Sequence, residues 1–530
     1  MPRGVPPPLR PPMPLLRAGS RASTTTRTIT PVAVGGSSAS SLSGACTCIT
    51  STPPLRYRPG LRTGCQTGQA LIFGLFVLTG GLAALFFLFN TGQMTSEKTK
   101  LVNTADAVAY SAGVMHARTL NYLAYTNRAM LANTVAIAQL VSLSSWHQYA
   151  RSTPLLGPQL GNPLKYPALY PSVLFLQEHM LNAAPDLMDG TTLQDAAERA
   201  DRQIQTVLQA AQSTVHAGLP FARQEVMEEV AHANYPGEGD GGLIVEPMLN
   251  ANDPFTGFVN RYDGDERGRF AEVAEIAAKR DAFQERRSWR LDALYPNCPS
   301  ALLRGRTDWI ERRGGTELIG YDEWRAIDTI AEHVWRPRNK TDVLCTRESE
   351  LPAGMGGTTA GNSMTFDADP RHYDYSAQKN PTTTGMATAI SAAPAWDYAG
   401  IPAFHDLSRQ WLESEDPSLR FSVRLRRPVR QTRTSEGRSA VRTSTRFNQL
   451  FAGAAGNELV AVSTSNVYFR RPAGMGCDGS NSGSRQNCYG LVEGMGGSER
   501  GSLFNPYWQV GLVQDGGAAQ ARRMQGVQLP

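Results

Sequence analysis

Between Arg62 and Glu97 the sequence runs for 34 residues without an Asp, Glu, Lys or Arg. Inside this run lies the apolar stretch Ala70–Phe89, which at about 1.5 Å per residue is long enough as a helix to cross a hydrocarbon core of ~30 Å. A buried core helix rarely stays apolar on all faces over such a length. A cleaved signal peptide is the stronger alternative, but its apolar region is shorter, and no small-residue cleavage site follows here. The stretch therefore predicts a transmembrane anchor over residues 67–92.

The basic residues around the apolar stretch predict its orientation. Eight arginines precede it, three of them within fifteen residues, whereas only Lys98 and Lys100 follow it closely. Basic flanks tend to stay on the cytoplasmic side of a membrane. We therefore expect a single-pass protein of the inner (cytoplasmic) membrane with a cytoplasmic N-terminus. Residues 93–530 would then lie outside the cytoplasm, in a periplasmic or equivalent compartment.

Residues 1–66 differ in composition from the rest of the chain. They are rich in Pro, Ser, Thr and Gly, and they contain eight arginines but no Lys, Asp or Glu. Such a stretch cannot bury enough apolar surface to offset the loss of chain entropy, so it predicts disorder. It is either a cytoplasmic tail or upstream sequence included by an early start codon. The remaining chain has 44 basic and 47 acidic residues, so the sequence pI of about 8.8 does not indicate a nucleic-acid partner.

Four cysteines follow the apolar stretch, and an even number outside the cytoplasm fits an oxidising compartment with two disulfides. Cys477 and Cys488 enclose a short Gly/Ser-rich segment, whose closure would stabilise the fold by roughly 3 kcal/mol. Cys298 and Cys345 are then the remaining pair by elimination. Free structural thiols are the alternative. Metal binding is disfavoured because there is no C-x-x-C motif and no flanking histidine, and no cofactor is expected.

Beyond the anchor, residues 93–150 predict a long juxtamembrane helix with few charges. Its small and apolar positions recur at alternating intervals of four and three, a period near 3.5 that is sustained over about four heptads. This surface is either a core face of the outside domain or a surface for self-association or for a partner near the membrane, and we expect the second. We call it the seam, and it consists of Leu101, Ala105, Val108, Ala112, Met115, Thr119, Tyr122, Thr126 and Ala129.

Two short motifs flank the apolar stretch. They consist of Gly68, Gln69 and Ala70 at its start and of Asn103, Ala105, Asp106, Ala107 and Ala109 beyond its end. With them, the segment from Gly68 to Gly113 resembles the N-terminal module of the Flp pilus-assembly TadE/TadG-like family, in which a Gly-Gln-Ala motif precedes one span and a short polar connector leads to a helix of the N-x-A-D-A-A-A-x-A type. The resemblance implies a bacterial cell-envelope protein of pilus assembly. Members that are processed as pilins carry a Glu where this chain has Phe73, so the resemblance implies an unprocessed component.

Residues 151–530 predict an extracytoplasmic α+β region with helices first and antiparallel strands in the C-terminal third. The segment 192–220 has a helical apolar stripe, and Gly218 and Pro220 predict its end. The remaining expected elements are helices at 221–233, 269–290 and 322–335, strands at 419–427, 458–471 and 507–514, and glycine-rich loops at 353–362 and 472–502.

Several short strings match catalytic or ligand-binding motifs, and each fails in its context. SAQK at Ser376–Lys379 matches the S-x-x-K of envelope acyltransferases, but it lies in a polar segment without the accompanying motifs. GEGDGG at Gly237–Gly242 carries two acids that would repel a pyrophosphate. DGDERG at Asp263–Gly268 has an Arg at a calcium-ligand position. We therefore predict no catalytic residue.

Two further patterns also have plain explanations. Many TadG proteins end in a von Willebrand A domain, and its D-x-S-x-S metal motif is matched by Asp478, Ser480 and Ser482. This string lies between two cysteines with only 48 residues after it, so we interpret it as a chance match. The segment 420–446 contains nine arginines and one acid. Alternate arginines on a strand usually form a solvated face, and we prefer that interpretation to an anion-binding surface.

Together these features predict a membrane-anchored, non-enzymatic component of Flp/Tad-type pilus assembly that acts by protein contacts. Its expected partners are the lipid bilayer and other envelope proteins or further copies of itself. The alternative is an anchored cell-envelope hydrolase or binding protein with an unrecognised site in the outer domain. A pocket that joins an acid, a base and a nucleophile would favour the alternative. A seam left uncovered by its own chain would favour the assembly hypothesis.

Overall fold

The computed structural model describes the chain in segments, and the packing discussed below lies within residues 74–530, which cluster as a unit separate from residues 1–73. The predicted tail at 1–66 is not among the residues that the structure describes. The described residues are 69–156, 162–180, 191–237, 242–249, 253–361, 379–391, 397–435, 438, 458–470 and 501–513.

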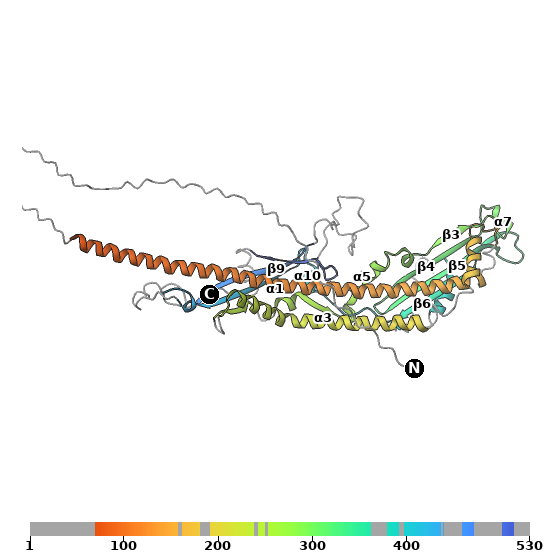
Figure 1. The fold of residues 1–530 in the computed structure, drawn as a ribbon. Coiled ribbons are helices and arrows are strands. Elements are labelled where there is room, and N and C mark those ends of the chain that lie inside the picture. Colours follow the sequence, from red (N-terminus) through yellow and green to blue (C-terminus); the bar gives the residue numbers. More distant parts are fainter. Residues whose placement is uncertain are drawn as a thin grey trace, which may run out of the picture. The chain divides into compact units, whose positions relative to one another are not determined.

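Helix α1 (Gln69–Leu156) is 88 residues long (Figure 1). Its sequence has no proline before Pro154, so nothing in it removes a backbone donor from the i→i−4 hydrogen bonds. The predicted apolar and juxtamembrane helices are therefore parts of one continuous helix.

Two further helices follow, α2 (Tyr170–Met180) and α3 (Thr191–Asn234). The prediction that a helix ends at Gly218 and Pro220 is wrong, because α3 continues through both residues. An internal proline removes one helical hydrogen bond. Here buried side chains next to the proline and after it, Leu219, Met227 and Ala231, hold the helix against the rest of the domain. Tertiary packing therefore outweighs the local cost of the proline, and the two predicted helices are one.

A four-stranded antiparallel sheet packs on the first buried part of α1. Its strand order is β1-β8-β9-β10, and the three predicted C-terminal strands are confirmed as β8, β9 and β10. The apolar residues of the alternating pattern in β8 are buried, while Arg424 and Arg426 form ion pairs with Glu246 of β1. The strands are β1 (Ile244–Pro247), β8 (Ser418–Pro428), β9 (Glu458–Phe469) and β10 (Trp508–Leu512).

A second four-stranded antiparallel sheet has the order β3-β4-β5-β6. The helix predicted at 322–335 is wrong, because this segment is strand β5. Its apolar residues from Trp324 to Val334 have helical spacing, but β5 is buried along most of its length. The positions between them hold buried charges such as Asp328 and Glu332, which form ion pairs. The strands are β3 (Trp289–Asp292), β4 (Trp309–Ile319), β5 (Glu323–Pro337) and β6 (Cys345–Gly361).

The loop predicted at the glycine-rich segment 353–362 is also wrong, because residues up to Gly361 form the end of strand β6. A Cβ atom on Gly356 would overlap the backbone oxygen of Ser145, and one on Gly354 would overlap Thr153. Both of those residues belong to α1. The glycines therefore let the strand approach the helix backbone closely, which is a known use of glycine inside strands.

Shorter elements connect the sheets. The helix predicted at 269–290 is divided into α5 and α6, and β3 begins before its predicted end. The α+β class is confirmed. The strands are not confined to the predicted C-terminal third, because the first of them begins at Ile244. The remaining elements are α4 (Pro254–Phe258), β2 (Val259–Tyr262), η3 (Gly264–Arg267), α5 (Gly268–Ala278), α6 (Ala282–Glu285), α7 (Pro299–Leu302), α9 (Pro381–Ser391), β7 (Phe404–Leu407), α10 (Arg409–Leu412) and η4 (Val429–Gln431).

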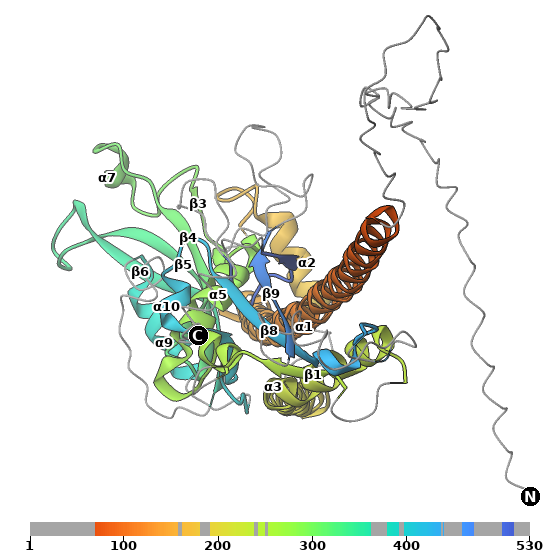
Figure 2. The same ribbon diagram turned by 90° about the vertical axis from the view of Figure 1, so that its left-hand side faces the viewer.

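Helix α1 contributes to each of the four larger apolar clusters. Its successive parts around Leu101, Leu120, Met130 and Tyr149 each pack in a different cluster. Strands β8 and β9 lie beside α1 in the rotated view (Figure 2), and α3 runs along it (Figure 1). The helix is therefore the element on which the described part of the domain is assembled.

Candidate functional site

The first part of α1 is apolar and uncovered. Among the described residues, α1 is the helix that is long and apolar enough to cross a membrane. None of its most apolar 18-residue window is buried. Large side chains such as Leu71, Phe73 and Phe76 are more than 70% exposed. A soluble protein would cover so large an apolar surface, so the exposed stretch fits membrane anchoring.

The seam begins where α1 enters the domain, and its first four residues are covered by this chain. Leu101, Ala105, Val108 and Ala112 have no exposed surface. They pack in one cluster with residues of α3 and of the β8–β9 pair, among them Phe421. The expectation that these positions form a free surface for self-association is therefore wrong. Folding of the outer domain onto α1 has already buried them.

Farther along, the seam leaves the buried face. Thr119 and Thr126 are buried and Met115 is partly buried, but Tyr122 is 38% exposed and Ala129 is also exposed. A straight helix has 3.6 residues per turn, so a strict 3.5-residue repeat drifts by about 20° per heptad around it. Over four heptads the drift carries the pattern toward solvent. The face that is buried follows the 3.6 period of a single straight helix.

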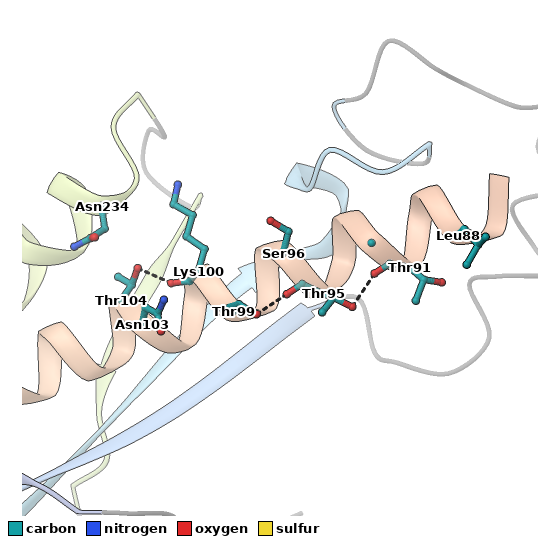
Figure 3. Close-up of a pocket in the computed structure, with 10 residues that line it drawn as sticks. Leu88, Thr91, Thr95, Ser96, Thr99, Lys100, Asn103, Thr104 and Asn234 are labelled. Atoms are coloured by element: carbon teal, nitrogen blue, oxygen red, sulfur yellow. Dashed lines mark hydrogen bonds between the residues drawn. The ribbon is translucent and has the colours of Figure 1, made fainter. Parts of the chain in front are cut away.

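A groove of about 870 Å³ flanks α1 just after the apolar stretch (Figure 3). It is lined by α1 residues between Leu88 and Thr104 and by Asn234 of α3. The Thr95 hydroxyl donates to the Thr91 carbonyl at 2.8 Å, and the Thr99 hydroxyl donates to the Thr95 carbonyl at 2.9 Å. These threonines thus use their donors on the helix itself and present a neutral surface.

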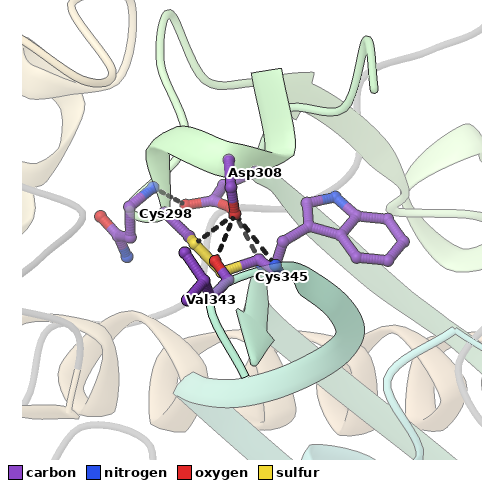
Figure 4. Close-up of a disulfide and its surroundings, with 7 residues drawn as sticks. Cys298, Asp308, Val343 and Cys345 are labelled. Atoms are coloured by element: carbon purple, nitrogen blue, oxygen red, sulfur yellow. Dashed lines mark hydrogen bonds between the residues drawn. A yellow bond between two sulfur atoms is a disulfide. The ribbon is translucent and has the colours of Figure 1, made fainter. Parts of the chain in front are cut away.

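The structure contains a disulfide between Cys298 and Cys345, which are 47 positions apart (Figure 4). Cys298 immediately precedes α7, and Cys345 begins β6. The hydroxyl of Ser300 accepts the backbone N–H of Cys345 at 3.0 Å, which positions the strand end. Cys477 and Cys488 lie outside the described residues.

A buried amide pair joins α1 to α3, and no local pattern in the sequence marks it. The Asn127 side-chain amide donates to the backbone carbonyls of His405 and Leu503 at 2.8 and 2.7 Å. The Gln212 amide of α3 donates to the Asn127 oxygen at 2.6 Å. Each of these groups would be costly to leave unpaired in the core. The pair therefore stabilises the packing of α1 against α3.

A buried cluster at His116 has the residue types of a catalytic site but a different arrangement. Arg223 bonds to Asp253 through two nitrogens, at 3.2 and 2.5 Å, and it donates to the Nε2 atom of His116 at 3.0 Å. Burial, followed by the Arg223 charge, lowers the pKa of His116 to about 3. The imidazole is therefore neutral and accepts a hydrogen bond from Arg223, whose guanidinium also pairs with the Asp253 carboxylate.

The structure describes the other motifs found in the sequence only in part. Asp263 precedes the short helix η3, and within the described ranges no group of three or more His, Cys, Asp or Glu residues could hold a metal ion. Most of SAQK and GEGDGG, and all of the D-x-S-x-S string, lie outside those ranges. The structure thus places the chain in a class of proteins in which one long helix begins with an uncovered apolar stretch and then continues into an α+β domain.

Comparison with known families agrees with that class for the N-terminal region. Residues 68–117 match the family model described as "Putative Flp pilus-assembly TadE/G-like". The resemblance found in the sequence is therefore confirmed for this region, which is under a tenth of the chain. No curated protein and no solved structure matches the chain. The match covers the apolar stretch and the first buried turns of α1, so it links a pilus-related role to this helix.

Proposed function

We propose that this protein is a membrane-anchored, non-enzymatic component of a Flp/Tad-type pilus-assembly apparatus. Its N-terminus lies in the cytoplasm, its apolar stretch crosses the inner membrane, and its α+β domain contacts other assembly proteins outside. The observation that carries the proposal is the coincidence of the family match at 68–117 with an apolar helix that the chain leaves uncovered. The neutral, hydrogen-bonded His116 supports a role without catalysis.

The contact surface is the exposed side of α1, because the first four residues of the seam are buried and only its later part, which includes Tyr122, reaches solvent. Tyr110, Tyr122 and Tyr125 are 45%, 38% and 62% exposed, and aromatic side chains are enriched at the centres of protein interfaces. They lie on the helix that continues from the membrane stretch. A partner anchored in the same membrane would meet this side of α1 first.

Topology is tested with cysteine labelling in spheroplasts. The variant keeps Cys298 and Cys345 and carries one free cysteine, either the native Cys65 or a Thr206→Cys substitution on exposed α3. An impermeant maleimide should label Thr206→Cys in intact spheroplasts and Cys65 only after lysis. Labelling of Cys65 alone in intact spheroplasts would reverse the proposed orientation.

The partner surface is tested by photo-crosslinking in cells that assemble pili. A photoreactive amino acid at Tyr125 or Tyr110 should capture another pilus-assembly protein or a second copy. The matched control is Phe221, which is 80% exposed on α3 and should give no adduct. Equal capture at all three positions, or pili that form normally after deletion of the gene, would contradict the proposed function.

A further inference from the structure

A lysine and two carboxylates meet in the interior where the α1–α2 connection reaches the second sheet. The Nζ atom of Lys165 lies 2.8 Å from Oδ2 of Asp308 and 2.7 Å from Oε1 of Glu332. All three side chains are at least 96% buried. Asp308 precedes β4, and Glu332 lies in β5. The three groups come from distant parts of the sequence, so only the fold brings them together.

The surroundings of this cluster are largely apolar. Tyr166, Ile310 and Ile330 form part of the adjacent core cluster, and the Tyr166 hydroxyl donates to Oε1 of Glu332 at 3.0 Å. Burial and the nearby Glu332 raise the pKa of Tyr166, so this hydroxyl keeps its proton. Ionised groups are costly in such a place. A reaction that removes one positive and one negative charge is therefore favoured there.

The two carboxylates are held differently. Oδ1 of Asp308 accepts the backbone N–H of Trp335 at 3.0 Å, and Oδ2 accepts that of Asn297 at 2.7 Å. The backbone groups thus fix the Asp308 carboxyl in place beside the disulfide (Figure 4). Glu332 has one oxygen on Lys165 and Tyr166, while its buried Oε2 has no hydrogen-bond partner within the described structure.

We propose that Lys165 and Asp308 condense in the folded chain to an intramolecular amide bond, with Glu332 as the proton carrier. The Nζ atom bonds to Cγ of Asp308, and the bond from Cγ to Oδ2 breaks. Two of the three ammonium protons leave with Oδ2 as water, and the third stays on the amide nitrogen. The charges of the ammonium and carboxylate cancel, so no oxidant, reductant or activated co-reactant is needed.

Each residue has a defined part in this reaction. Glu332 accepts a proton from Nζ, which frees the lone pair, and delivers it to Oδ2. After Nζ has bonded to Cγ, Glu332 carries the second proton to the departing Oδ2 in the same way, as general acid–base catalysis requires. The N–H of Trp335 stabilises the negative charge that develops on Oδ1. Amide formation between separate molecules is unfavourable in water, but groups held in contact can reach effective molarities of about 10⁵ M or more. The fold supplies this advantage.

The geometry selects Asp308 over two neighbouring carbonyl carbons. The Asn297 side-chain oxygen also contacts Lys165 at 2.9 Å, but Asn297 is exposed, so the burial that favours a loss of charge at Asp308 is weaker there. Glu332 has no backbone donor in place for the oxygen that would become negative. The exposed position of Asn297 beside Oδ2 gives the released water a route to solvent.

The bond would join residues 143 positions apart. It would tie the turn before α2 to the start of β4, close to the Cys298–Cys345 disulfide. Two covalent links of different chemistry would then secure the same end of the second sheet. The amide link would persist under reducing conditions, which break the disulfide.

Peptide mass spectrometry of the full chain, purified in detergent, reduced, denatured and digested with trypsin, tests the proposal. Trypsin cuts after Lys and Arg, so a free Lys165 gives peptides 152–165 and 166–199, and Asp308 lies in peptide 307–312. With the amide bond, cleavage after Lys165 is blocked. A branched peptide of 152–199 and 307–312 should then replace these three. It should be lighter than their sum by two waters, one lost in the condensation and one that is not added at the uncleaved bond after Lys165.

Recovery of the three separate peptides from the wild-type chain as the main products would overturn the proposal. A branch that contains Asn297 or Glu332 in place of Asp308 would also overturn it, and these residues fall in different tryptic peptides.

Two variants assign the roles. Lys165→Arg should release peptide 307–312 completely, whereas Lys279→Arg on the exposed surface should leave the branched peptide unchanged. Glu332→Gln should lose at least nine-tenths of the branched peptide while the Cys298–Cys345 disulfide still forms, which shows that this end of the domain has folded. Wild-type levels of the branched peptide in Glu332→Gln would refute the part given to Glu332.

Discussion

At the scale of single residues, His116 connects three elements of the domain through its neutral form. Its ring stacks on Phe255 with centroids 5.7 Å apart and meets the edge of Phe421 at 5.0 Å. Its Nε2 atom accepts from Arg223. Burial disfavours the charged imidazolium, and protonation would also convert this acceptor into a donor that faces a guanidinium, so the folded state holds the pKa at about 3.

This shift makes stability depend on pH. In the unfolded chain the histidine has a pKa of about 6.5, so between about pH 6.5 and 3 the unfolded state binds a proton that the folded state does not. The free energy of unfolding therefore falls as the pH falls through this window. From pH 7 to pH 5 His116 alone should account for a loss of about 2 kcal/mol, measured by urea unfolding.

The substitution His116→Gln keeps a hydrogen-bond acceptor for Arg223 but removes the titrating group. Its loss of stability from pH 7 to 5 should be smaller than that of the wild type by this amount. The same substitution at exposed His232 serves as the control and should not change the pH dependence. An unchanged slope in His116→Gln would show that other groups, such as the buried His405, account for the acid sensitivity.

At the scale of elements, the contact between β6 and α1 depends on glycine. Gly356 faces the α1 backbone so closely that a methyl group would overlap the Ser145 oxygen and the Tyr149 nitrogen. Gly356→Ala must push the strand and the helix apart, and overpacking of this kind costs typically 1–3 kcal/mol. We expect a loss near the top of this range in the free energy of unfolding, because backbone atoms cannot rotate away.

Gly385 in α9 provides a matched control. A Cβ atom there would meet nothing within 4 Å, so Gly385→Ala should stabilise the helix by roughly 0.5–1 kcal/mol. The same change of residue should thus have opposite signs at the two positions. Equal effects would mean that β6 does not approach α1 as closely as the structure shows.

At the scale of the whole molecule, the apolar stretch and the domain should be thermodynamically separable. None of the most apolar window of α1 is buried, whereas Leu101 is the first fully buried apolar residue of this helix. A chain that begins at Phe89 keeps Asn90, whose side chain bonds to Ser435. It should be soluble without detergent and unfold at the same urea concentration as the full chain.

A shorter chain that begins at Ala105 gives the contrast. It lacks Leu101, which is fully buried in the cluster with α3 and β8, and loss of such a side chain costs about 2–5 kcal/mol. If the chain that begins at Phe89 is destabilised to the same extent, the apolar stretch supports the fold of the domain and the two parts are not separable.

The sequence alone determined those features that depend on local composition and period. The length and apolarity of Ala70–Phe89 predict a membrane-compatible helix, the motifs after Gly68 identify the family resemblance, and the alternation in β8 predicts a strand. Each of these signals needs only neighbours in the sequence. The seam was recognised for the same reason, since its small and apolar residues recur along one helix.

Only the tertiary structure decided what covers the seam and what the ambiguous segments become. Strand β5 has helical spacing of its apolar residues, and it is a strand because partners for Asp328 and Glu332 come from other elements. Gly356 resembles a loop residue until α1 lies against it. The Lys165 cluster joins residues up to 167 positions apart. Burial and pairing depend on distant parts of the chain, so no local pattern could reveal them.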